Sequence, residues 1–279
     1  MSSDRSQTVY AASAADLALC ALDALRGVEG TALVAAHVER ADDPKAALAA
    51  IRIVGADAFA PHLLGDAVLH PEDAAAVSQS FAVFPPPVST PGPPPSGPVE
   101  PWIAAWRDWA TAALVARLAG TEGDGLLAPQ PSGAPVLTDH SEGAARGADT
   151  GGPDTSAPDV AASASAAAAS ATSDTDWQRW SVHMGQLSPL AVPALDSPVH
   201  AAARAAPLAL AHGATRAVLR RDFPTATHIT RWLALLHADG VRLPLDPVPL
   251  VEHLRLHGGG PRLALDVAIA RRLLGMESP

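Results

Sequence analysis

Prolines and glycines divide most of this sequence into short apolar segments, and this punctuation constrains the fold more than any other feature. Proline suits the first turn of a helix, where its missing N–H removes no hydrogen bond, and glycine commonly follows the last turn. Segments that begin with proline and end with glycine cover residues 44–55, 101–120 and 247–258. The pattern predicts a chain of short α-helices.

The composition supports a helical fold. Hydrophobic residues make up 48% of the chain and aromatic residues only 4%, so strand-favouring side chains are scarce, while alanine, the best helix former, is abundant. Alanine buries little apolar area, and each helix therefore gains less from packing than a leucine-rich one. We expect a mainly all-α fold, with a C-terminal helical bundle joined by proline-rich and disordered linkers to a small, mostly helical N-terminal region.

The N-terminal region, residues 1–84, is small and acidic, and three of its segments carry helix signals. These are residues 11–26, residues 44–54 and the stretch that begins at Pro71. Residues 31–38 are apolar and partly β-branched, and their periodicity does not decide between strand and helix. The sequence leaves both alternatives open for that stretch.

Two linkers follow this region, one on each side of a helical segment at residues 99–120. Residues 85–98 contain two runs of three prolines, which predicts a stiff, extended polyproline II linker. Residues 121–173 consist mostly of glycine, serine, threonine, aspartate, proline and alanine, without an aromatic residue, a composition typical of disorder. We expect this acidic segment to be a disordered tether or a surface loop.

The C-terminal domain, residues 174–279, carries five segments with helix signals. Helices are expected to start near residues 174, 198, 224, 247 and 261, with a kink in the second of them at Pro207. Short connections rich in glycine and proline between such helices are typical of a helical bundle.

Tryptophan is the dominant large aromatic residue, with six copies against one tyrosine and four phenylalanines. Five tryptophans and one methionine lie on the two helices that flank the tether, and they are the candidates for a core or a partner-binding face: Trp102, Trp106, Trp109, Trp177, Trp180 and Met184. We expect the helix over residues 99–120 to pack on the C-terminal domain beside Trp177 and Trp180, because its aromatic face must be covered. An exposed tryptophan groove for an apolar ligand or a partner helix is the alternative.

Charge is distributed unevenly along the chain. The formal net charge is −10, yet residues 177–279 carry 11 arginines and 7 acidic residues. Arg216, Arg220 and Arg221, with Arg204 further back on the same predicted helix, form a basic stripe that is a candidate anion-binding surface. No nucleic-acid-binding motif accompanies the stripe. We therefore expect a solvated face or ion pairs with the acidic tether, and we do not expect nucleic acid as the partner.

Histidines are a second group of candidate residues. His253 and His257 stand four residues apart on a predicted helix and are weak candidates for a metal site, since no third ligand is visible in the sequence. We expect no metal and no cofactor, and the expected role of His257 is a favourable interaction with the helix C-terminus. His228 and His237 join this pair as candidate groups for an enzyme pocket.

Recognisable catalytic motifs are absent from the sequence: it has no nucleophile elbow, phosphate-binding loop or dinucleotide-binding glycine pattern. Cys20 is the only cysteine, so no internal disulfide can form, which fits a reducing compartment. No stretch reaches the roughly 18 uninterrupted apolar residues of a membrane span. The expected location is the cytoplasm, without membrane contact.

These features favour a non-enzymatic helical protein-interaction protein, an adaptor or regulator whose partner is another protein. A single lysine among 19 basic residues fits a GC-rich bacterial genome. One alternative is an enzyme or enzyme-accessory protein with a histidine-lined pocket in the C-terminal domain, and convergent histidines would favour it. The second is a nucleic-acid-binding protein that uses the basic helix, and a continuous arginine surface would favour it.

Overall fold

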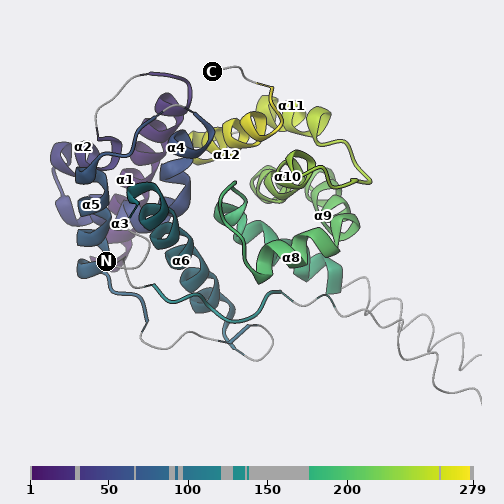
Figure 1. Cartoon of the computed structure of the whole chain (residues 1–279), viewed down its shortest axis with the longest axis horizontal. Helices are drawn as coiled ribbons and strands as arrows, with labels where there is room; N and C mark the ends of the chain where they lie inside the picture. The colour runs from purple at the N-terminus through teal and green to yellow at the C-terminus, as the bar shows by residue number, and fades with distance from the viewer. Residues whose placement is uncertain are drawn as a thin grey trace, which may run out of the picture.

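The computed structural model describes residues 2–28, 32–65, 67–87, 92–93, 97–120, 128–135, 137, 176–257 and 259–276. All regular secondary structure in these residues is helical, which confirms the all-α fold expected from the composition. The helices form an N-terminal and a C-terminal half, which meet along the helices Val99–Ala119 (α6) and Gly260–Leu273 (α12) (Figure 1).

The N-terminal half follows the proline and glycine signals. Its elements are α1 (Ser2–Leu25), α2 (Leu33–Arg40), α3 (Pro44–Val54), the 3-10 turn η1 (Gly55–Phe59), α4 (Ala60–Leu64) and α5 (Pro71–Val83). α1 starts earlier than the predicted residue 11, because no proline or glycine interrupts the sequence between Ser2 and Arg26. α3 begins at the predicted proline, and Asp43 caps it by accepting the N–H of Lys45 at 3.0 Å.

The segment that the sequence left open is α2, and a contact from a distant helix explains why it is helical. Asp73, in the first turn of α5, is fully buried and accepts hydrogen bonds from the backbone N–H groups of Val34 at 2.7 Å and Ala35 at 2.9 Å. These donors lie in the first turn of α2, where N–H groups have no partner within the helix. A residue of α5 therefore caps α2 and stabilises it as a helix.

α6 lies between the two halves (Figure 1). It contacts η1 and α5 on the N-terminal side and the 3-10 turn Ser188–Leu190 (η3) on the C-terminal side. Asp108 accepts a hydrogen bond from Arg52 Nε of α3 at 2.8 Å, and Arg117 donates to the carbonyl of Ala194 at 3.3 Å. The helix over residues 99–120 therefore packs on both halves, and not on the C-terminal domain alone as we expected, because its polar side chains have partners on each side.

The C-terminal half begins with helical residues 176–186. It continues with η3, α8 (Pro198–Ala205), α9 (Pro207–Leu219), α10 (Phe223–Ala238), α11 (Pro247–His257) and α12. The kink expected at Pro207 is a complete break, since Ala206 has φ −131° and ψ 51° and separates α8 from α9. The other predicted helix starts are confirmed to within two residues.

α12 joins the halves, because it packs on α1 and on α10 alike (Figure 1). Arg272 donates a hydrogen bond to the carbonyl of Leu25 at the end of α1 at 2.7 Å, and Arg262 donates to the carbonyl of Val54 at the end of α3 at 3.1 Å. One hydrophobic core runs from α1 through α6 to α10 and α12. The N-terminal region and the C-terminal domain therefore share a core.

Most tryptophans are core residues. The following large side chains are at most 2% exposed: Trp102, Trp106, Trp180, Met184 and Trp232. Trp106 makes edge-to-face contacts with Trp102 and Trp109, at 6.4 and 5.3 Å between ring centroids, as the shared face predicts; Trp109 and Trp177 are half-buried. The chain itself covers the buried rings, so they offer no exposed groove to a partner.

A short segment of the predicted tether connects the two tryptophan-bearing helices. Trp102 Nε1 donates to the carbonyl of Ser132 at 3.3 Å, and Trp180 Nε1 donates to the carbonyl of Pro135 at 2.9 Å. Both carbonyls belong to residues 128–135, which pack on the core although the composition predicts disorder for them. The α6 tryptophans and Trp180 therefore meet around this segment.

The two predicted linkers are only partly described. Of residues 121–173, most lie outside the described part of the chain, so their predicted disorder stays a prediction. In the linker 85–98, the N–H of Gly97 donates to the carbonyl of Pro93 at 3.2 Å. Pro93 and Gly97 therefore lie closer together than a fully extended linker would place them.

Two helical stretches are long and apolar enough to cross a membrane by length and composition, Gln7–Leu25 and Pro44–Leu64. Within the fold they are 33% and 72% buried. Both stretches contain charged residues, yet their mean hydropathy meets the criterion for a membrane span. Core helices of soluble proteins and signal sequences pass it too, so a cytoplasmic location without membrane contact stays an expectation.

Candidate functional site

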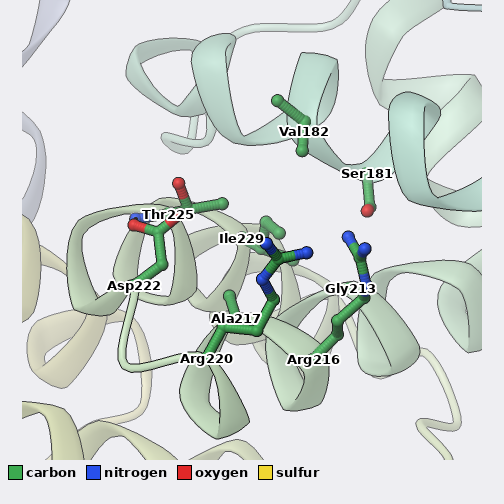
Figure 2. Close-up of a pocket in the computed structure, with 9 residues that line it drawn as sticks. All are labelled: Ser181, Val182, Gly213, Arg216, Ala217, Arg220, Asp222, Thr225 and Ile229. Carbon is green, nitrogen blue, oxygen red and sulfur yellow. The ribbon is translucent and has the colours of Figure 1, made fainter.

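The C-terminal half contains a cavity of about 190 Å³. It lies between the helical residues 176–186, α9 and the first turns of α10 (Figure 2). Its lining combines small, apolar, hydroxyl and charged side chains: Ser181, Val182, Gly213, Arg216, Ala217, Arg220, Asp222, Thr225 and Ile229.

A glycine brings two walls of the cavity together. A Cβ atom on Gly213 of α9 would lie 2.4 Å from the Cβ of Ser181, so any larger residue would push the neighbouring helix away. Because Gly213 has no side chain, Ser181 packs directly on α9, where it is buried and its Oγ donates to the carbonyl of Gln178 at 2.9 Å. Ser181 thereby forms a fixed wall of the cavity.

Two arginines supply the positive charge of the pocket. Arg216 and Arg220 stand four residues apart on α9, a spacing that places them on the same side of the helix. Both guanidinium groups extend from α9 toward the helix that carries Ser181 (Figure 2), and neither forms a hydrogen bond or an ion pair with another described residue. Two unpaired guanidinium groups on one cavity suit an anion with at least two oxygens.

The start of α10 contributes a carboxylate and a hydroxyl group. Asp222 is the N-cap of α10, and its Oδ1 accepts the N–H of Thr225 at 3.2 Å. The carboxylate offsets one of the two arginines, so the formal charge of the lining is +1. The pocket therefore stays positive, with a single carboxylate at its edge.

The predicted basic stripe divides in the structure. Arg216 and Arg220 line the pocket, whereas Arg221 lies in the turn after α9, exposed and with a φ of 58°. Arg204 belongs to α8 and contacts Asp196 at 3.1 Å and Asp239 at 3.8 Å. The break before Pro207 removes Arg204 from the stripe, and the four arginines do not form one continuous surface.

Two exposed apolar side chains belong to the pocket lining or adjoin it in sequence. Val182, in the lining, is 39% exposed, and Leu219, which directly precedes Arg220 on α9, is 79% exposed. Arginine next to exposed apolar side chains is typical of protein interfaces, where arginine is enriched and lysine and acidic residues are depleted. Sequence reasoning found the arginines by their spacing but gave no signal for the exposure of these two apolar residues.

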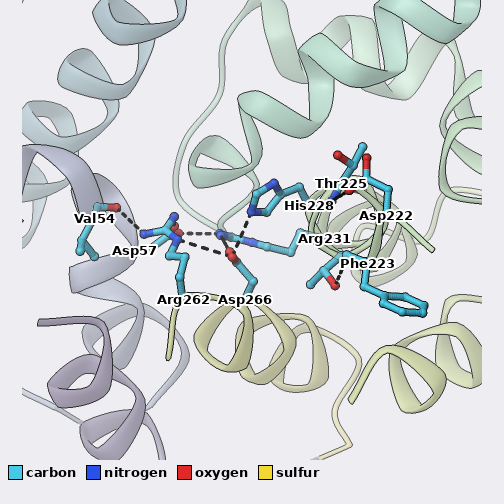
Figure 3. A network of polar contacts seen from close by, with 10 residues as sticks. Val54, Asp57, Asp222, Phe223, Thr225, His228, Arg231, Arg262 and Asp266 are labelled. Atoms are coloured by element: carbon cyan, nitrogen blue, oxygen red, sulfur yellow. Dashed lines mark hydrogen bonds and ion pairs between the residues drawn. The ribbon is translucent and has the colours of Figure 1, made fainter. Parts of the chain in front are cut away.

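A second polar cluster is buried where the halves meet (Figure 3). Arg231 of α10 contacts Asp57 of η1 at 2.7 Å and Asp266 of α12 at 2.6 Å, and all three side chains are fully buried. Arg262 contacts both aspartates, and His228 Nε2 lies 3.2 Å from Asp266 Oδ2. All four carboxylate oxygens of the two aspartates are engaged in ion pairs. Arg231 Nε, by contrast, is buried without a hydrogen-bond partner among the described residues. This cluster is hereafter the junction network.

The charges of the junction network stabilise one another. Burial alone lowers the pKa of Arg231, but Asp57 and Asp266 outweigh it and hold the pKa above its ordinary value. Burial raises the pKa of Asp266, and Arg262, His228 and Arg231 outweigh this effect and hold it below its ordinary value. The other charges of the network therefore hold Arg231 and Asp266 in their charged forms in the folded protein. We assign the network a structural role, linking η1 to α10 and α12.

The four histidines proposed for an enzyme pocket do not converge. His228 belongs to the junction network, and His237 is exposed. The rings of His253 and His257 lie 4.3 Å apart, and Phe223 packs on His257 at 4.9 Å. Among the described residues, no group of three or more histidine, cysteine or acidic side chains could hold a metal ion.

The structure also places a serine and a histidine together that sequence reasoning missed. Ser197 Oγ lies 2.9 Å from His200 Nδ1, and His200 Nε2 lies 3.0 Å from the carbonyl of Leu190. The distance suits a nucleophile and its base, but both side chains are less than 10% exposed and the imidazole packs on Trp232. Ser197 precedes α8 and His200 lies in its first turn, and the Ser197 side chain makes no capping hydrogen bond to the helix backbone. The pair is therefore a buried polar contact beside Trp232. The sequence pattern Ser-Pro-x-His at residues 197–200 is the signal from which this pair could have been predicted.

Comparison with protein-family models, curated proteins and solved structures gives no match to the chain. Function must therefore be argued from the chain's own residues, and the pocket at Arg216 and Arg220 offers the most specific chemistry among them.

Proposed function

We propose that the chain is a non-enzymatic helical protein-interaction protein, an adaptor or regulator, and that it binds an anionic group of its partner in the pocket at Arg216 and Arg220. The observation that supports this proposal is a pair of guanidinium groups that extend into one cavity and have no hydrogen bond or ion pair with any other residue in the described part of the chain. Arg216 is half-buried and Arg220 is exposed, so both are accessible to a partner, whose carboxylate or phosphate would bring charge-assisted hydrogen bonds.

The surroundings of the pocket favour a protein as the partner. Val182 and Leu219 expose apolar area beside the arginines, so a bound polypeptide would bury apolar surface and satisfy the charges in the same contact. Nucleic acid would need several phosphate contacts along a positive surface. Arg204 is already paired with two aspartates, and this shortens the surface that a nucleic acid would use.

Charge reversal at the pocket tests the proposal. Arg216→Glu with Arg220→Glu in the full chain should reduce partner affinity at least about 100-fold, since each lost charge-assisted hydrogen bond costs about 1.5–3 kcal/mol. The measurement is affinity isolation from host extract with quantitative mass spectrometry, with circular dichroism to show that the variant is folded.

The matched control is Arg221→Glu with Arg242→Glu, which makes the same charge change at two exposed arginines outside the pocket. We expect one or a few proteins to be recovered with the wild type and the control and lost with the pocket variant. Recovery of the same proteins with all three chains would contradict the proposal.

A further inference from the structure

We infer that the pocket holds a phosphoryl group, carried on a serine or threonine side chain of the partner. This inference rests on the proposed function and specifies the chemistry of the group that the partner presents. It follows from the number of donors in the pocket, the size of the cavity and the charge of its lining.

The donors outnumber what a carboxylate can accept. Each guanidinium can direct two N–H groups at one anion in a planar fork, and Thr225, whose hydroxyl is a further possible donor, lines the same cavity. A carboxylate offers about four acceptor positions on two oxygens, whereas a phosphate monoester offers three strongly accepting oxygens and nearly two negative charges. Arg216, Arg220 and Thr225 together therefore match a phosphoryl group better than an aspartate or glutamate side chain.

The cavity is sized for a single group with a short stem. Its volume of about 190 Å³ lies below the roughly 300–1,000 Å³ typical of pockets that enclose whole small molecules. A nucleotide would leave its base outside, whereas the side chain of a phosphorylated residue would fit, with its backbone near Val182 of the lining, which is 39% exposed. The size of the cavity thus favours a modified side chain over a free cofactor.

The negative charge of Asp222 would repel a bound phosphoryl group, so removing that charge tests whether the pocket holds an anion. Its carboxylate lines the pocket and caps α10 through the N–H of Thr225. Asparagine can keep that cap while removing the charge. Asp222→Asn should therefore tighten phosphoryl binding on the order of threefold, the effect of one nearby unit charge in a solvated site. A site that did not hold an anion would show no such gain.

Binding of small probes to the full chain tests the inference directly. Isothermal titration calorimetry at constant ionic strength would compare N-acetyl-phosphoserine amide with N-acetyl-glutamate amide, which carries a carboxylate on a similar backbone, and with vesicles containing phosphatidic acid, a lipid phosphomonoester. We expect the phosphoserine probe to bind most tightly. Arg220→Gln should weaken it about tenfold or more, the factor for one lost charge-assisted hydrogen bond, and Arg221→Gln at the neighbouring position outside the pocket should leave it unchanged.

The outcomes separate this inference from the proposed function. Equal or tighter binding of the glutamate probe, or binding of the vesicles alone, would overturn the phosphoryl assignment. Phosphatase treatment of the host extract should abolish capture of the partner by the wild-type chain. If capture survives phosphatase but still depends on Arg216 and Arg220, the interaction stands and the phosphoryl group is wrong. If the phosphoserine probe binds but no captured protein depends on the pocket, the phosphoryl site stands and the proposed function is wrong.

Discussion

Replacing Asp57 with asparagine is expected to lower the free energy of unfolding by about 3–5 kcal/mol, the usual cost of breaking a buried ion pair from one side. The substitution keeps the shape of the side chain but removes a charge that contacts Arg231 at 2.7 Å and also pairs with Arg262. Arg231 is fully buried, so it cannot compensate by turning to water. Asp266 alone would then have to balance two arginines.

Denaturant unfolding followed by circular dichroism measures this effect. Asp42→Asn is the matched control, because it makes the same chemical change at an exposed aspartate and should alter the free energy of unfolding by less than about 0.5 kcal/mol. If both variants unfold at the midpoint of the wild type, the junction network contributes nothing to the union of the two halves, and its assigned structural role is wrong.

Trp106→Ala should lower the free energy of unfolding by about 3–5 kcal/mol, the range for removing a buried tryptophan. Trp106 is 0% exposed and stands between Trp102 and Trp109 in a row of edge-to-face contacts. An alanine-rich core has few large side chains that can move into the space, so the cavity should persist. Because α6 contacts both halves, the loss should affect the whole fold.

Urea unfolding of the full chain, monitored by circular dichroism, tests this expectation. Leu256→Ala is the control, since that side chain is 71% exposed and its removal should leave the midpoint unchanged. A Trp106→Ala variant with an unchanged midpoint would show that the ring is not a core residue and would reopen the alternative of a partner-binding tryptophan face.

The sequence predicts the helices well because their signals are local. Proline at the first turn and glycine after the last act within a few residues, and α3, α5, α6, α10, α11 and α12 start or end where those signals stand. α2 is the instructive exception: its N-terminal N–H groups bond to Asp73, which lies 38 residues or more further along. No reading of residues 31–38 alone can include that partner.

The junction network was not predicted for the same reason. Asp57 and Arg262 are 205 residues apart, and their pairing depends on how α12 packs across the chain onto α1. The sequence does not distinguish a buried, ion-paired aspartate from an aspartate at the surface. Residues 128–135 were wrongly predicted to be disordered. Their carbonyls accept the indole N–H of Trp102 and of Trp180, but the composition of the whole tether does not show so short an ordered stretch.

The candidate site was predicted in part. The spacing of Arg216 and Arg220 on one helix is local information, and the structure keeps both on one side of α9 and on one cavity. Their neighbour Ser181 comes from another helix, and its approach depends on the missing side chain of Gly213. A contact between two helices cannot be predicted from the sequence of either helix alone. The sequence therefore predicted the pair of arginines but not the cavity that they line.

The central claim is that partners contact the face of the C-terminal half around the pocket, and site-specific crosslinking in the native host tests it most directly. A benzophenone amino acid would replace Leu219, which is 79% exposed beside the pocket, or Val68, which is 74% exposed in the N-terminal half. The account predicts a discrete crosslinked partner from position 219 and none from position 68, and loss of that crosslink when Arg216→Glu and Arg220→Glu are added. Equal crosslinking from both positions, or a position 219 crosslink that survives the charge reversal, would contradict it.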